Sequence, residues 1–113
     1  MHEISLCEGI LLVLEEQAAS QGFQRVTKVW LEIGDLAGVE LEALRFGFEV
    51  VTRNSLADGA VLEILGVQGE AWCMQCSARV VVKQRFDRCP RCGGFQLQVV
   101  GGEQMRIKEL EVE

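Results

Sequence analysis

The sequence of 113 residues has no tyrosine, one proline and a single histidine. That histidine, His2, stands at the amino end, where it cannot readily serve as the base for a serine or cysteine nucleophile, and this disfavours a hydrolase. Long apolar runs are also missing, because none approaches the about 18 residues that a membrane span needs. The start of the chain lacks the apolar segment of a secretory signal, and we therefore expect a soluble protein of the cytoplasm.

Cysteine is present in a regular pattern. Four of the five cysteines form two Cys-x-x-Cys pairs with twelve residues between them, namely Cys73, Cys76, Cys89 and Cys92. Each pair can place both sulfurs on one side of a tight turn, and two facing pairs offer four soft donors at the corners of a tetrahedron, as Zn²⁺ prefers. Gly93 after the second pair can adopt a positive φ, and Ser77 after the first pair is small.

Two disulfides or a redox-active pair are the alternatives to a metal site. Disulfides are disfavoured in the reducing compartment that we expect for this chain. A thioredoxin-like pair would stand alone at the start of a helix, whereas here a strand-like segment joins two pairs. Four thiolates also close the coordination sphere and leave no position for water or substrate, so we predict a structural zinc ion.

Acidic residues outnumber basic ones by 17 to 11, and the excess is uneven along the chain. Residues 1–69 carry a net charge of −7, residues 70–102 carry +3 and residues 103–113 carry −2. One Zn²⁺ with four thiolates adds about −2 to the middle segment. The basic charge of that segment is then nearly cancelled, so nucleic acid is a weak candidate for a partner.

Apolar spacing predicts two helices and two strands before the first cysteine pair. These are helices over residues 3–21 and 40–52 and strands over residues 25–36 and 60–67. The first helix should end at Gly22, and Cys7 lies on its apolar stripe, which favours a small core residue over a catalytic thiol. The acids of the second helix, Glu40 among them, are expected on its solvated face. Both faces of the second strand are fairly apolar, which favours a central place in the sheet.

The cysteine pairs lie in a segment that interrupts this pattern. Short strands predicted over residues 79–85 and 96–100 supply the small antiparallel sheet of a zinc ribbon. The tail, residues 105–112, alternates apolar and charged residues and is predicted to return as a strand to the first sheet. The expected fold class is therefore α+β, with a small mixed sheet packed with two helices and an inserted four-cysteine zinc-ribbon module. The predicted domains are residues 1–69 with 103–113, and residues 70–102.

The amino terminus offers a second set of metal donors. The amine of Met1 and the amide nitrogen of His2 can close a five-membered chelate, and that amide with the His2 imidazole closes a six-membered one. A fourth donor could be the Glu3 amide nitrogen, the Glu3 carboxylate or a group from a partner, which would complete the planar set that Ni²⁺ or Cu²⁺ prefers. An incidental exposed histidine is the alternative on geometry alone. Protons would compete with metal at such a site near neutrality.

Several stretches together resemble one family. They are MHEISLC at residues 1–7, VTKVWLEIGDL at 26–36, RFGFEVV at 45–51, AWCMQC at 71–76 and RCPRCGG at 88–94. The combination is similar to HypA/HybF, the nickel-insertion accessory proteins of [NiFe]-hydrogenase maturation, and the likeness covers the whole chain. Many unrelated proteins carry a zinc ribbon, but the Met-His-Glu start at this separation from one is highly specific.

The resemblance implies a nickel metallochaperone that is not an enzyme. It implies that Met1, His2 and Glu3 bind the transported Ni²⁺, and that Cys73, Cys76, Cys89 and Cys92 bind a structural Zn²⁺. The implied partners are a HypB-type GTPase, the hydrogenase large-subunit precursor and, in some organisms, urease accessory proteins, with no membrane or nucleic acid. A monomer or a weak homodimer is expected. The family often has histidines beside the cysteine pairs, whereas Ser77 and Gly93 follow the pairs here, so any role of such histidines does not carry over.

A zinc-ribbon module that recognises nucleic acid or another protein, without carrying nickel, is the competing hypothesis. Its support is a set of five basic residues, namely Arg79, Lys83, Arg85, Arg88 and Arg91. The acidic total and the absence of tyrosine for base stacking stand against the nucleic-acid version.

Overall fold

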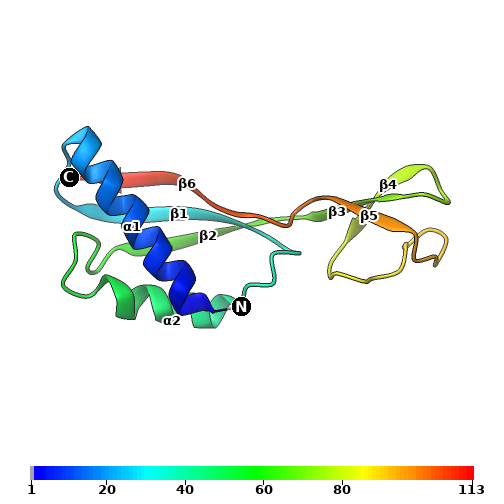
Figure 1. The fold of residues 1–113 in the computed structure, drawn as a ribbon, viewed down its shortest axis with the longest axis horizontal. Coiled ribbons are helices and arrows are strands. Elements are labelled where there is room, and N and C mark those ends of the chain that lie inside the picture. Colours follow the sequence, from blue (N-terminus) through cyan, green and yellow to red (C-terminus); the bar gives the residue numbers. More distant parts are fainter. Residues whose placement is uncertain (1) are drawn as a thin grey trace. The chain divides into compact units, whose positions relative to one another are not determined.

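A computed structural model describes residues 2–113 (Figure 1). The helices are α1 (Glu3–Gln21) and α2 (Leu41–Thr52), and the strands are β1 (Val26–Gly34), β2 (Val61–Val67), β3 (Gly69–Cys73), β4 (Ala78–Val82), β5 (Leu97–Gly101) and β6 (Met105–Val112). Two helices with two small sheets confirm the predicted α+β class. None of the helices in residues 2–113 is both long and apolar enough to cross a membrane.

Helix α1 has the predicted length and end. Its buried residues are Cys7, Ile10 and Leu14. Cys7 and Leu14 belong to the apolar stripe, and Ile10 lies beside it. Gly22 follows the helix with φ 78°, and its N–H donates to the Ala18 carbonyl, which is a left-handed C-terminal cap. The expectation that Cys7 is a core residue is confirmed, because its side chain is fully buried.

The first sheet has the strand order β2-β1-β6. Central β1 alternates as predicted, since Val29, Leu31 and Ile33 are buried while Lys28, Trp30 and Glu32 are half-buried. The C-terminal strand β6 returns to this sheet, which confirms the expectation for residues 105–112. The expectation that residues 60–67 form a central strand is wrong, because β2 is an edge strand and Leu62 is its one buried side chain.

The second sheet, with order β4-β3-β5, carries the cysteine segment. Strand β3 pairs antiparallel with β4 from Gly69↔Val82 to Cys73↔Ala78, and with β5 on its other side. The ribbon strand expected at 79–85 is present as the shorter β4, and the strand expected at 96–100 is present as β5, shifted by one residue. Strand β3, which runs through Glu70 to Trp72, lies between them in the sheet.

The described chain forms two compact units. The first extends to Leu31 and takes in Val39–Ile64 and Ile107–Glu113, and the second comprises Glu32–Gly38 and Leu65–Arg106. The second unit therefore includes the whole four-cysteine segment. The domain boundaries derived from the sequence, at residues 69/70 and 102/103, stay a prediction.

Candidate metal centres

The four paired cysteines come together through the pairing of the second sheet. Cys73 ends β3, and Cys76 lies in the turn that joins β3 to β4. Cys89 and Cys92 lie in the loop between β4 and β5, and the pairing Cys73↔Leu97 brings the end of that loop beside the first pair. All four sulfurs lie within 4.8 Å of one another.

The spacing of the sulfurs suits a tetrahedral metal ion. Cys73 Sγ lies 3.7 Å from Cys92 Sγ, and Cys76 Sγ lies 3.9 Å from Cys89 Sγ. Four sulfurs at the usual Zn–S distance of about 2.3 Å stand about 3.8 Å apart along each tetrahedral edge. None of the described cysteines is in a disulfide. The donor set therefore fits Zn²⁺ in both chemistry and spacing.

Backbone groups shape each cysteine turn. Cys76 N–H donates to Cys73 Sγ and Arg91 N–H donates to Cys89 Sγ, both at 3.4 Å. The residues after the pairs, Ser77 and Gly93, have φ of 49° and 72°. The positive φ expected of Gly93 is present, and Ser77 adopts the same left-handed conformation with a small side chain.

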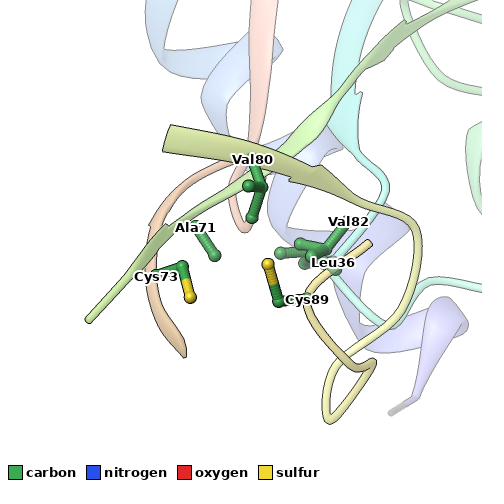
Figure 2. Close-up of a cluster of buried hydrophobic side chains, with 6 residues drawn as sticks. All are labelled: Leu36, Ala71, Cys73, Val80, Val82 and Cys89. Atoms are coloured by element: carbon green, nitrogen blue, oxygen red, sulfur yellow. The ribbon is translucent and has the colours of Figure 1, made fainter. Parts of the chain in front are cut away.

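The sulfur cluster rests on a small hydrophobic core. Leu36, Ala71, Val80 and Val82 are buried together with Cys73 and Cys89, as Figure 2 shows. Cys92, by contrast, is exposed. The core holds two of the four sulfurs on fixed backbone, so the metal would complete an arrangement that packing already favours.

The thiols differ in how readily they lose a proton. Burial raises the pKa of Cys89, but N–H groups of Cys92 and Arg91 outweigh that effect and bring the pKa down to about 6. Hydrogen bonding with the Cys92 sulfur, followed by burial, raises the pKa of Cys76 to about 12. Four thiolates so close together cannot all be ionised without a cation, and a divalent ion at their centre would supply that charge.

The second predicted site falls at the start of α1. Met1 lies outside the described residues. His2 is the residue preceding the helix, its side chain is exposed, and it makes no capping hydrogen bond. Glu3 is the first helical residue, so its backbone N–H has no acceptor within the helix.

The Glu3 side chain contacts the second helix. Glu3 Oε2 accepts a hydrogen bond from Glu40 N–H at 3.1 Å, and this bond lowers the pKa of the Glu3 carboxyl. Glu40 in turn caps α2, because its carboxylate accepts from Glu42 N–H and Ala43 N–H at 3.4 and 2.7 Å. Glu40 is exposed, as expected, and its capping role is an addition that was not predicted from the sequence. Its place just before an apolar helical stripe was a signal, although glutamate is not among the favoured capping residues.

Gly47 allows the two helices to approach closely near this site. A Cβ at Gly47 would lie 3.0 Å from Ile4 Cδ1, 3.2 Å from Cys7 Sγ and 3.7 Å from the Glu3 carbonyl oxygen. Cys7 Sγ donates to the Leu44 carbonyl at 3.4 Å, and burial raises its pKa to about 11. Cys7 is thus a neutral packing residue that fixes the first turns of α1 against α2. Figure 1 shows these ends of the two helices near the N label.

Two of the five basic residues of the cysteine segment are already engaged. Arg79 pairs with Glu70 at 3.3 Å. Arg85 pairs with Glu103 at 2.9 Å and donates to the Leu36 carbonyl at 3.1 Å. A continuous basic face for nucleic acid is therefore weaker than the sequence alone indicates.

Comparisons with known proteins agree on one family. A family model described as "Hydrogenase/urease nickel incorporation, metallochaperone, hypA" matches residues 1–112. The protein named Hydrogenase maturation factor HypA from Azotobacter chroococcum mcd 1 is 61% identical over the full length of both chains, as is that from Alkalilimnicola ehrlichii. The solution structure of the Ni metallochaperone HypA from Helicobacter pylori has a similar fold, with a TM-score of 0.71 at 24% identity, covering 99% of this chain and 97% of that one.

Proposed function

The chain belongs to the HypA family of hydrogenase and urease nickel-incorporation metallochaperones, and we propose that it binds Ni²⁺ at its amino terminus and delivers it during [NiFe]-hydrogenase maturation. It is a maturation factor and not an enzyme. The proposed nickel ligands are Met1, His2 and Glu3. The proposed zinc ligands are Cys73, Cys76, Cys89 and Cys92. Residues 1–69 with 103–113 would form the nickel-binding domain and residues 70–102 the zinc module.

One observation carries the nickel proposal. His2 precedes α1 with an exposed side chain that makes no capping bond. The imidazole and the unpaired first amides of the helix are therefore available together, and nitrogen donors in this order suit the planar geometry of Ni²⁺.

The fourth nickel donor is better assigned to a backbone nitrogen of this chain than to its carboxylate. Glu3 Oε2 already accepts the Glu40 N–H. Moving the carboxylate to the metal would leave that N–H without its acceptor and would loosen the contact between the helices. We therefore assign the Glu3 amide nitrogen as the donor and the Glu3 side chain as the group that positions it.

The zinc ion would have a structural role. Four thiolates fill a tetrahedron, so no open position remains for a substrate. The ion would hold the loop containing Cys89 and Cys92 against β3, and its binding energy would contribute to folding of this segment.

The proposed partners follow from the family. They are a HypB-type GTPase, the hydrogenase large-subunit precursor and, where urease is present, its accessory proteins, all in the cytoplasm. Neither membrane nor nucleic acid is proposed as a partner, and two of the bases that would favour nucleic acid, Arg79 and Arg85, are engaged in ion pairs within the chain. A monomer or a weak homodimer is proposed.

Calorimetric titration of Ni²⁺ into the zinc-loaded protein tests the site. The variants are His2→Ala, a protein with one extra residue before Met1, and the control Ser5→Ala, which changes an exposed residue of the same helical turn. We expect both site variants to lose most of their nickel affinity and the control to retain it. Wild-type affinity in both site variants would refute the amino-terminal site.

A further inference from the structure

The loop between β4 and β5 presents an aromatic side chain in an unusual way. Phe86 is 95% exposed and has a φ of 68°. A bulky residue rarely adopts this left-handed conformation, which persists only where surrounding contacts hold it. Here the Asp87 carboxylate accepts hydrogen bonds from Lys83 N–H and Gln84 N–H at 3.2 and 3.0 Å. The turn therefore holds Phe86 out into solvent.

A small apolar cavity lies beside Phe86. Its volume is about 210 Å³. Most of its lining is apolar, namely Ala71, Val82, Phe86, Phe95, Leu97 and Val99, and the polar residues of the lining are Gln84, Arg85 and Asp87. Pockets for small molecules commonly measure about 300–1,000 Å³, so this one suits a side chain of a peptide better than a cofactor. Phe95 is itself 64% exposed. Two exposed aromatic rings at one cavity are the kind of feature that anchors a protein partner.

Basic residues are frequent in the loop that carries Phe86, and one of them contacts the cavity lining. Between Lys83 and Cys92 the bases are Lys83, Arg85, Arg88 and Arg91, and the one acid is Asp87. The Arg88 guanidinium lies 4.9 Å from the centroid of the Phe95 ring. Asp87 Oδ2 is held by the two backbone N–H groups, and within residues 2–113 no ion pair involves Lys83, Arg88 or Arg91. Arg88 is therefore a cation beside the cavity that is available to pair with a carboxylate of a partner.

We propose that Phe86, Phe95 and the cavity between them, here called the Phe86 surface, bind an acidic segment of a partner protein that inserts one apolar side chain. The apolar side chain would fill the cavity, and a flanking carboxylate would meet Arg88, because the lining residue Arg85 already pairs with Glu103. Charge complementarity selects this occupant, because a basic or purely apolar segment would leave the Arg88 charge unmatched. The inference does not depend on nickel binding.

Nitrogen–proton correlation NMR of the zinc-loaded, nickel-free protein tests it, with the capped peptide Asp-Glu-Leu-Phe-Glu-Asp as the probe. We expect shift changes concentrated at Phe86, Phe95 and Val99, and binding that weakens as salt is raised. Replacing every acid of the peptide by lysine should abolish binding. A lysine peptide that binds equally well, or no shift change with the acidic peptide, would overturn the proposal.

Two variants separate recognition from folding. Phe86→Gly removes the ring and suits the positive φ, so we expect peptide binding to fall about tenfold while stability to urea does not decrease. Val81→Ala, an exposed change on β4 outside the cavity lining, should leave binding unchanged. Wild-type peptide affinity in Phe86→Gly would refute the surface. Shift changes at these residues when the protein concentration is raised, with no peptide present, would show that a second copy of the chain occupies the surface. That result would also overturn the proposal.

Discussion

The contact between α1 and α2 at Gly47 can be tested by a double-mutant cycle with Cys7. A methyl group at position 47 would stand 3.2 Å from Cys7 Sγ and 3.0 Å from Ile4 Cδ1. The Ile4 side chain is 42% exposed and its end can rotate away, whereas Cys7 is fully buried and bonded to the Leu44 carbonyl. The sulfur is therefore the group that resists the added methyl.

The expected magnitudes follow from two opposing effects. Alanine is favoured over glycine by about 1 kcal/mol within a helix. Overpacking a well-packed core costs about 1–3 kcal/mol. Gly47→Ala alone should therefore destabilise the protein by about 0–2 kcal/mol. In a Cys7→Ala background the sulfur is absent, so Gly47→Ala should stabilise the protein by about 1 kcal/mol. The double mutant should therefore be about 1–3 kcal/mol more stable than the sum of the two single changes predicts.

Urea unfolding of the zinc-saturated protein, followed by far-ultraviolet circular dichroism, measures the four free energies of the cycle. Gly9→Ala is the matched control, because it changes a glycine of α1 whose added Cβ would have nothing within 4 Å. It should stabilise by about 1 kcal/mol with or without Cys7. If Gly47→Ala and Cys7→Ala prove additive within about 0.5 kcal/mol, the close approach of the helices at Gly47 is refuted.

Three further predictions concern the two candidate centres. Cys73→Ala should lose stoichiometric zinc and the ordered signals of residues 70–102 while keeping the helical signals of α1, and zinc analysis with NMR checks this, since retained tight zinc would contradict it. The hydrogen bond from Glu40 N–H lowers the pKa of the Glu3 carboxyl in the folded state. The contribution of Glu3 to the free energy of unfolding is therefore complete above about pH 4.5, the ordinary pKa of the group, and is lost as pH falls through the lowered folded-state pKa. Wild type should therefore lose more stability than Glu3→Gln between pH 6 and pH 3 in urea titrations, and parallel curves would argue against the Glu40 bond. Leu36→Ala, at a side chain 2% exposed beside the cysteines, should reduce stability by about 2–5 kcal/mol, whereas the exposed change Val81→Ala should have an effect within about 0.5 kcal/mol.

Features that depend on local spacing could be predicted from the sequence. The apolar stripe and Gly22 located α1 and its end, because both are set by residues within a few turns of each other. The alternation around Trp30 likewise located β1. The Cys-x-x-Cys spacing located the four-sulfur cluster, since two residues between cysteines impose a turn whatever the rest of the fold does.

Features that depend on distant partners could not be predicted in this way. The apolar faces of β2 indicated a central strand. Strand order is decided by which segments pair, however, and here β1 is central because β2 pairs with one of its edges and β6 with the other. The bond from Glu40 N–H to the Glu3 carboxylate joins residues 37 positions apart, so no local pattern indicated it. Gly47 is unfavourable in a helix by propensity alone, and its reason is the approach of Ile4 and Cys7 across the helix pair.

The geometry of the cysteine cluster suits retention of a metal ion, whereas the geometry of the amino terminus suits its release. At the cysteine cluster, Cys73 and Cys89 are buried, and loss of the ion would leave thiolates crowded at about 4 Å, so release requires protons and local unfolding together. At the amino terminus the His2 imidazole is exposed and precedes the helix rather than belonging to it. A metal held there would leave without breaking the contacts by which Cys7 and Glu3 fix α1 to α2. A carrier needs such a site for its cargo, because delivery must not require the protein to unfold.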